Sequence, residues 1–148
     1  METFFNPLSV AIVGATEKPG SLPGIILKNL LSMGFKGKIY PVNPKYETVF
    51  GLNCFPSILD IPDEVALTVI AIPAPWVLDV LQQQAHKRIR HAIIISAGFR
   101  EKGAEGIEME ERIRRVAIEN DMRILGPNCL GVLDNYTNFT TSFLSWER

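Results

Sequence analysis

The stretch SVAIVGATEKPGS, residues 9–21, decides the fold expected for this chain. Its first half is a short apolar run rich in Val and Ile, which is typical of a buried strand. The run ends at Gly14, and a polar loop follows. Residues 21–34 then carry apolar residues at helical spacing and stop at Gly34. A buried strand that turns straight into a helix is typical of an α/β fold with a parallel sheet.

The same alternation of strand and helix patterns continues along the chain. Residues 48–65 predict a loop or short helix, with a candidate short strand at Leu52–Phe55. Strands of continuous apolar character between helices indicate about five parallel strands covered on both faces. We therefore expect a doubly wound, mainly parallel, Rossmann-like α/β domain. Its further strands are expected at residues 37–44, 66–73, 91–99 and 123–128, and its further helices at residues 74–88 and 103–122.

The expected domain fills nearly the whole chain. A length of 148 residues suits a single domain with a core of its own. Residues 129–148 are rich in Asn and Thr, and their pattern is that of a tail or linker. We place the domain at residues 1–143 and expect residues 144–148 to be a tail toward an absent second domain.

The composition narrows the classes of partner and cofactor. The formal net charge is -1, so no overall basic field attracts nucleic acid or a membrane surface. Cys54 and Cys129 have no second cysteine or histidine at metal-ligand spacing, which predicts neither a disulfide framework nor a metal site. The chain shows no signal-peptide pattern and no apolar run near the ~20 residues that span a bilayer. We therefore expect a cytoplasmic protein without a nucleic-acid or membrane partner.

The segments that follow the five expected strands are the candidates for a binding site. In open α/β sheets a ligand binds outside the carboxyl ends of the strands. All five segments are rich in Gly, Pro, Ser and other small residues, so their backbones can approach a ligand closely. Each segment alone is also consistent with a plain turn. The segments are GATEKPGS (14–21), PVNPKY (41–46), IPAPW (72–76), SAGFRE (96–101) and GPNCLG (126–131).

The first of these segments has the make-up of an anion site. Free N–H groups at the start of a helix, together with the helix dipole, attract phosphate. Thr16 and Ser21 add hydroxyl donors, and Lys18 adds a positive charge. The alternative is a plain turn in which Ser21 caps the helix.

The features that the loop lacks narrow the choice of phosphate ligand. No second glycine stands where the dinucleotide fingerprint G-x-G-x-x-G requires one, and no Walker sequence occurs. The second strand ends in Asn43 and Lys45 rather than in the carboxylate that holds free ribose hydroxyls. A lysine there suits a phosphorylated ribose. This leaves an NADP-dependent reductase open and also suits the 3′-phospho-ADP half of coenzyme A.

Five motifs in order carry a resemblance to a known family: VGATEKPGS, GKIYPVNPKY, AIPAPWV, ISAGFRE and GPNCLGV. At these spacings the chain resembles the coenzyme A-binding domain of the NDP-forming acyl-CoA synthetases. It is also similar to the N-terminal domain of the succinyl-CoA synthetase alpha subunit. The motifs YPVNPKY, ISAGFRE and GPNCLG favour the acyl-CoA synthetase branch. The resemblance runs from about Phe5 to Phe143 and implies coenzyme A as the ligand.

The resemblance also implies which residues contact the coenzyme. Its phosphates are expected on the first loop, its nucleotide end near Lys45, and its thiol end near Cys129. Glu17 is a departure, because the succinyl-type loop has a glycine there, so contacts at this position are expected to differ. The full set of expected coenzyme contacts is Gly14, Ala15, Thr16, Glu17, Lys18, Pro19, Gly20, Ser21, Asn43, Lys45, Ile72, Pro73, Ala74, Ile95, Ser96, Ala97, Asn128 and Cys129.

The family's chemistry needs parts that this stretch does not contain. In the family, a histidine in the following domain is phosphorylated, and an ATP-grasp module exchanges that group with a nucleoside diphosphate. His86 and His91 are expected away from the strand ends, so no catalytic residue is expected here. We expect this chain to bind coenzyme A without turnover, with the remaining synthetase domains or an ATP-grasp beta subunit as partners. The alternative is a stand-alone regulatory module that senses coenzyme A or a nucleotide.

Overall fold

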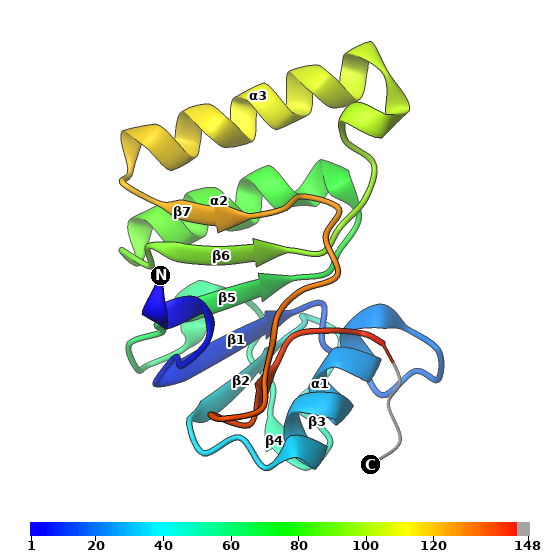
Figure 1. Cartoon of the computed structure of the whole chain (residues 1–148), viewed down its shortest axis with the longest axis vertical. Coiled ribbons are helices and arrows are strands. Elements are labelled where there is room, and N and C mark those ends of the chain that lie inside the picture. The colour runs from blue at the N-terminus through cyan, green and yellow to red at the C-terminus, as the bar shows by residue number, and fades with distance from the viewer. Residues whose placement is uncertain (145–148) are drawn as a thin grey trace.

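A five-stranded parallel sheet forms the centre of the computed structural model, which describes residues 1–144 (Figure 1). The strand order is β2–β1–β5–β6–β7. Counted in chain order, these five strands follow the sequence 2-1-3-4-5, which is one of the two common doubly wound orders. The predicted α/β, mainly parallel architecture is therefore confirmed. The strands are β1 (Ser9–Val13), β2 (Lys38–Val42), β5 (Leu67–Ile70), β6 (His91–Ile94) and β7 (Arg123–Leu125).

Helices cover both faces of this sheet. Within residues 1–144 the α-helices are α1 (Leu22–Met33), α2 (Val77–His86) and α3 (Ala104–Glu119). Helix α1 ends at Gly34, whose φ of 75° places it in the left-handed region that favours glycine, as the sequence predicts. The described part of the chain also has short 3-10 helices: η1 (Glu2–Phe4), η2 (Ile58–Asp60), η3 (Ala74–Trp76) and η4 (Arg100–Lys102).

Successive residues of the central strands β1, β5 and β6 point into two separate hydrophobic cores. In β1, Val10 and Ile12 pack with α1, whereas Ala11 and Val13 pack with α2 and η2. This alternation follows from the two-residue period of a strand. Since both sets are apolar, both sheet faces are buried, and the carboxyl edge of the sheet is left for a ligand.

In the described residues, two small hairpins lie outside the main sheet. One is formed by β3 (Thr48–Val49) and β4 (Leu52–Asn53), and the other by β8 (Leu133–Asp134) and β9 (Phe139–Thr140). The candidate strand at Leu52–Phe55 is thus confirmed in its first half.

The prediction of a tail or linker from residue 129 onward is wrong. The β8–β9 hairpin packs on α1, where the fully buried ring of Phe139 lies 5.1 Å from that of Phe35. Asn29 of α1 also donates hydrogen bonds to the carbonyls of Ser142 and Leu144, both at 3.0 Å. The segment is ordered because its few apolar residues complete the core on the α1 face. Residues 145–148, most of the expected tail, lie outside the described residues.

Candidate functional site

The main cleft lies where the strand order in the sheet reverses, between β1 and β5. Strand β1 has β2 on one side and β5 on the other, so the connections that leave β1 and β5 diverge to opposite faces. Such a switch point opens a crevice at the carboxyl ends of the strands. The structure has a cleft of about 580 Å³ there, within the range of small-molecule sites.

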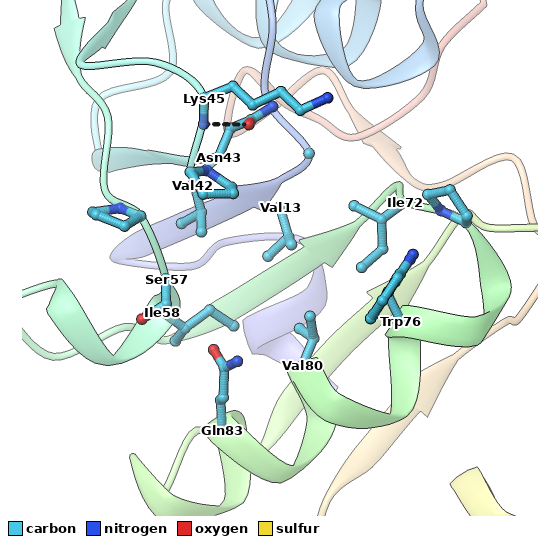
Figure 2. A pocket seen from close by; sticks show the side chains of 14 residues that line it. Val13, Val42, Asn43, Lys45, Ser57, Ile58, Ile72, Trp76, Val80 and Gln83 are labelled. Atoms are coloured by element: carbon cyan, nitrogen blue, oxygen red, sulfur yellow. Dashed lines mark hydrogen bonds between the residues drawn. The ribbon is translucent and has the colours of Figure 1, made fainter.

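The walls of this cleft are mostly apolar (Figure 2). Val13 and Val42 form its floor at the ends of β1 and β2, and Ile72 and Trp76 form one side. The polar groups at its rim include the Lys45 ammonium and the Gln83 amide. Apolar walls with a few polar groups at the rim suit a flat, partly polar ring. The complete lining is Val13, Gly14, Val42, Asn43, Pro44, Lys45, Pro56, Ser57, Ile58, Ile72, Pro73, Trp76, Val80 and Gln83.

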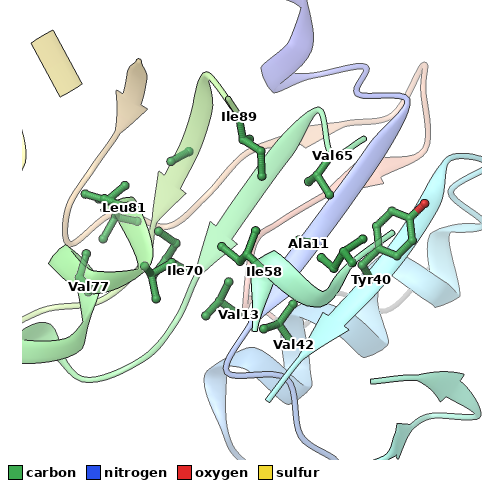
Figure 3. Packing of buried hydrophobic residues seen from close by; sticks show 14 of the residues in the cluster. Ala11, Val13, Tyr40, Val42, Ile58, Val65, Ile70, Val77, Leu81 and Ile89 are labelled. Carbon is green, nitrogen blue, oxygen red and sulfur yellow. The ribbon is translucent and has the colours of Figure 1, made fainter. Parts of the chain in front are cut away.

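The floor of the cleft is continuous with the core on the α2 face (Figure 3). Val13, Val42 and Ile58 line the cleft and also belong to that hydrophobic cluster. Side chains held in a packed core cannot swing freely, so these walls are fixed before a ligand arrives. The site is therefore pre-formed on its apolar side.

Gly14 is required at the point where β1 ends. Its φ of 94° is rarely adopted by residues with a side chain. A Cβ at this position would lie 2.6 Å from the carbonyl oxygen of Ala71 and 2.8 Å from the side chain of Ile72. The glycine therefore lets the anion loop, defined here as residues 14–21, turn out of β1 directly beside the cleft.

In the anion loop the main-chain N–H groups, rather than the hydroxyl groups, are available to bind a ligand. The Thr16 hydroxyl donates to the hydroxyl of Tyr46, and the Ser21 hydroxyl donates to the carbonyl of Lys18 at 2.8 Å. Ser21 is the N-cap residue of α1, but its side chain makes no capping bond. Within residues 1–144, no hydrogen bond uses the main-chain N–H of Ala15, Thr16 or Glu17. These consecutive amides are the donors that the loop can offer to an anion.

Two lysines stand near these amides with their charges uncommitted. Lys18 lies within the anion loop, and Lys45 lies at the rim of the cleft, and both are exposed. Neither forms an ion pair with any other residue in the described part of the chain. Both charges are therefore available to a phosphate ligand at low cost.

A second group of predicted contacts lies along the same edge of the sheet, at the ends of β6 and β7. The Ser96 hydroxyl accepts the N–H of Ile72 at 3.2 Å, and the Ser96 carbonyl accepts the N–H of Asn128 at 2.9 Å. Ala97 is exposed beside them, whereas the side chain of Ile95 is buried in the α1-side core. These bonds join the ends of β5, β6 and β7 into one continuous edge.

The predicted residues thus lie in several places, with residues 15–21 in the anion loop beside the cleft. The structure brings Gly14, Asn43, Lys45, Ile72 and Pro73 together in the cleft. It places the predicted residues at positions 95–97 and 128–129 further along the edge, outside the cleft lining. Ala74 starts η3 and lines a small neighbouring depression instead.

Both cysteines lie in surroundings that favour the thiol. Burial raises the pKa of Cys129 and of Cys54, so both remain protonated at neutral pH. The Cys129 sulfur lies 3.4 Å from the carbonyl oxygen of Ile94, and the Cys54 sulfur lies 3.6 Å from that of Asn43. A protonated thiol is a poor nucleophile, so these surroundings favour a structural role for Cys129 over a nucleophilic one.

Both histidines lie away from the carboxyl ends of the strands, as the sequence predicts. His91 begins β6, and His86 ends α2 and is exposed. Burial and nearby positive charges lower the pKa of His91, so its ring is neutral at pH 7. Among residues 1–144 no three His, Cys, Asp or Glu side chains form a cluster that could hold a metal ion.

Sequence reasoning missed the wall of the cleft formed by η2 and α2. Pro56, Ser57 and Ile58 reach the site from a loop that carries no binding motif. Val80 and Gln83 follow Trp76 at spacings of four and seven residues, which places all three on one helix face. A polar Gln in that apolar row was the signal that could have identified this wall.

These features define an α/β protein with a nucleotide-sized cleft beside an anion loop. A family profile described as CoA binding domain matches residues 8–135. The chain therefore belongs to the CoA binding domain family, which confirms the expected resemblance and coenzyme A as the family's ligand. Within residues 1–144, no helix is both long and apolar enough to cross a membrane.

Curated relatives and solved structures agree with this family. The chain is 47% identical over 144 residues to the ADP-forming acetate–CoA ligase II of Archaeoglobus fulgidus, covering 97% of this chain and 21% of that protein. It is 42% identical to the alpha subunit of the ADP-forming acetate–CoA ligase I of Pyrococcus furiosus, covering 97% of this chain and 32% of that subunit. The dinucleotide-forming acetyl-coenzyme A synthetase 1 of Ca. Korarchaeum cryptofilum, solved with phosphate and ADP, superposes with a TM-score of 0.91 at 41% identity. The match covers 96% of this chain and 30% of that chain. The chain thus spans between about a fifth and a third of the length of these relatives.

Proposed function

We propose that this chain holds coenzyme A across the carboxyl edge of its sheet, as the coenzyme-binding part of an NDP-forming acyl-CoA synthetase. The observation that carries the proposal is the juxtaposition of the apolar cleft, the unpartnered amides of residues 15–17 and Lys45. An apolar cleft suits the adenine ring, amides suit a diphosphate, and a free lysine suits the 3′-phosphate.

The remaining part of the coenzyme has a path along the same edge. The ends of β5, β6 and β7 are joined through Ser96 and Asn128, and Cys129 lies at the far end. An extended pantetheine arm that starts at the anion loop would follow this edge toward Cys129. The predicted contacts at residues 95–97 and 128–129 would then meet the arm rather than the nucleotide.

The reaction assigned to the whole synthetase is acyl-CoA + NDP + phosphate ⇌ acid + CoA + NTP. The contribution of this chain is to bind and orient the coenzyme. The phosphoryl-transfer steps would belong to further synthetase domains or an ATP-grasp subunit, because His86 and His91 both lie away from the cleft. A cytoplasmic location is consistent with two free cysteines and with this metabolic role.

Calorimetric titration with coenzyme A and dephospho-coenzyme A, on the wild type and on Lys45→Ala, tests the proposal. We expect Lys45→Ala to weaken coenzyme A by about 1–3 kcal/mol, the range for a hydrogen bond to a charged group. Dephospho-coenzyme A lacks the 3′-phosphate, so its affinity should be the same for both proteins. Lys36→Ala, an exposed lysine beyond the end of α1, is the matched control. A wild type that ignores coenzyme A but binds NADP⁺ would contradict the proposal.

A further inference from the structure

Three consecutive residues of the anion loop are tied to a single neighbouring segment. The carbonyl of Ala15 accepts the side-chain N–H of Asn43 at 2.9 Å. The Thr16 hydroxyl donates to the Tyr46 hydroxyl at 3.2 Å, and the Glu17 carboxylate accepts the main-chain N–H of Phe50 at 2.5 Å. We call residues 43–50, which lead from β2 into the β3–β4 hairpin, the anchoring segment.

The first of these bonds fixes the direction of a loop amide. A peptide unit is planar, and its C=O and N–H point in opposite directions. Because Asn43 holds the Ala15 carbonyl on the side of β2, the N–H of Thr16 in the same peptide unit points away from β2. The Asn43 side-chain oxygen also accepts the main-chain N–H of Lys45 at 3.0 Å. One side chain therefore holds both the backbone of the anion loop and the backbone at Lys45.

The second bond involves a hydroxyl that also closes a compact turn inside the loop. The Thr16 oxygen accepts the N–H of Lys18 at 3.1 Å while its proton goes to Tyr46. The Thr16 side chain is buried, whereas Tyr46 is 42% exposed, so the bond between the two hydroxyls is shielded from water on the Thr16 side. Tyr46 therefore completes the hydrogen bonding of a group that shapes the loop.

The third bond ties the one carboxylate of the loop to the neighbouring hairpin. Phe50 and Gly51 both have positive φ, 48° and 74°, and form the tight turn of the β3–β4 hairpin. The Phe50 N–H at this turn binds Glu17 and holds its negative charge on the hairpin. A carboxylate left free beside bound phosphates would repel them.

We propose that the anchoring segment is the positioning device of the anion loop, with Asn43 and Tyr46 as positioning residues for the diphosphate. The three hydrogen bonds orient the loop amides before a ligand arrives and leave Lys45 alone to recognise the 3′-phosphate. The entropic cost of ordering the loop therefore falls on folding rather than on binding, which raises the affinity for the ligand. This inference rests on the proposed function.

The affinity test uses Tyr46→Phe, which removes one hydroxyl and keeps the ring. We expect it to weaken coenzyme A and dephospho-coenzyme A by the same factor, about 2- to 10-fold, because the effect acts through the diphosphate. Lys45→Ala should weaken coenzyme A alone. Adding Tyr46→Phe to Thr16→Val should cause no further loss, because both variants remove the same bond. Equal affinities of Tyr46→Phe and the wild type, or a loss confined to coenzyme A, would overturn the inference.

A second readout needs no ligand and separates this inference from the proposed function. We expect the amides of residues 15–18 in the ligand-free wild type to have NMR order parameters of about 0.85, typical of rigid backbone. In Asn43→Ala and Tyr46→Phe they should fall toward about 0.6, with the melting temperature of the core little changed. A loop equally ordered in wild type and variants overturns the positioning role. Ordered wild-type amides without any binding of coenzyme A contradict the proposed function instead.

Discussion

Gly14 carries a strict steric requirement at the cleft, because both its φ and its surroundings exclude a side chain. We predict that Gly14→Ala lowers the free energy of unfolding by about 2–4 kcal/mol, from left-handed strain plus a clash with the Ala71 carbonyl. Urea denaturation measures this loss.

The matched control is Gly20→Ala in the same loop. Gly20 also has a positive φ, 74°, but a Cβ there would meet no atom within 4 Å. Only the backbone strain remains, about 1–2 kcal/mol. Equal losses in the two variants would show that the close approach of the loop to β5 does not constrain the site.

Only some of the site residues are predictable from the sequence. Gly14, Lys45 and Ile72 follow directly after buried strands, so the rule that strand ends meet at one edge finds them. Ser57 and Gln83 come from a loop and from the middle of a helix, and only the packing of η2 against α2 brings them to the cleft. The hydrogen bond of Tyr46 could not be predicted from the sequence either, because its partner Thr16 lies thirty residues away.

The β8–β9 hairpin is the element whose importance is easiest to test. Phe139 is fully buried between α1 and the sheet. We predict that Phe139→Ala lowers the free energy of unfolding by about 3–5 kcal/mol, the usual cost of emptying a buried aromatic site. Tyr136→Ala, in the same hairpin at 99% exposure, should change it by less than about 0.5 kcal/mol. Similar values for both would mean that the hairpin does not belong to the core.

The contact between η1 and β6 predicts a dependence of stability on pH. The Phe4 and His91 rings lie 5.3 Å apart, edge to face, and burial lowers the pKa of His91 below its usual 6.5. The unfolded chain therefore takes up a proton more readily, and the free energy of unfolding should fall as pH drops below about 6.5. His91→Phe should flatten this slope in urea titrations between pH 5 and pH 7, whereas His86→Gln, which retains His91, provides the reference slope. An unchanged slope in His91→Phe contradicts the assignment.

At the scale of elements, long patterns were predictable and short ones were not. The strands and helices of the main sheet have several apolar residues in a row or at helical spacing, which is enough to identify them. The strands of both hairpins have two residues each, too few to show a period. In residues 129–144 the abundant Asn and Thr hide the buried Val132 and Phe139, and the burial of Phe139 depends on α1.

For the whole molecule, binding at the strand ends should stabilise the native state. A ligand that binds only the folded chain adds about 2.7 kcal/mol to the free energy of unfolding at a hundredfold excess over Kd. We expect coenzyme A to raise the melting temperature of the wild type in proportion to the logarithm of its concentration. NADP⁺ should have a smaller effect, because the loop lacks the dinucleotide fingerprint. The opposite ranking would favour the reductase interpretation.

The most direct test of the account is to map amide chemical shifts during a titration of the ¹⁵N-labelled chain with coenzyme A. We expect the largest changes at the anion loop, at Asn43 to Lys45, at Ile72 and at the indole N–H of Trp76, which is 61% exposed at the cleft. Smaller changes should extend through Ser96 to Cys129. Changes confined to the opposite edge of the sheet, around His91 and Arg123, or no changes at all, would contradict it.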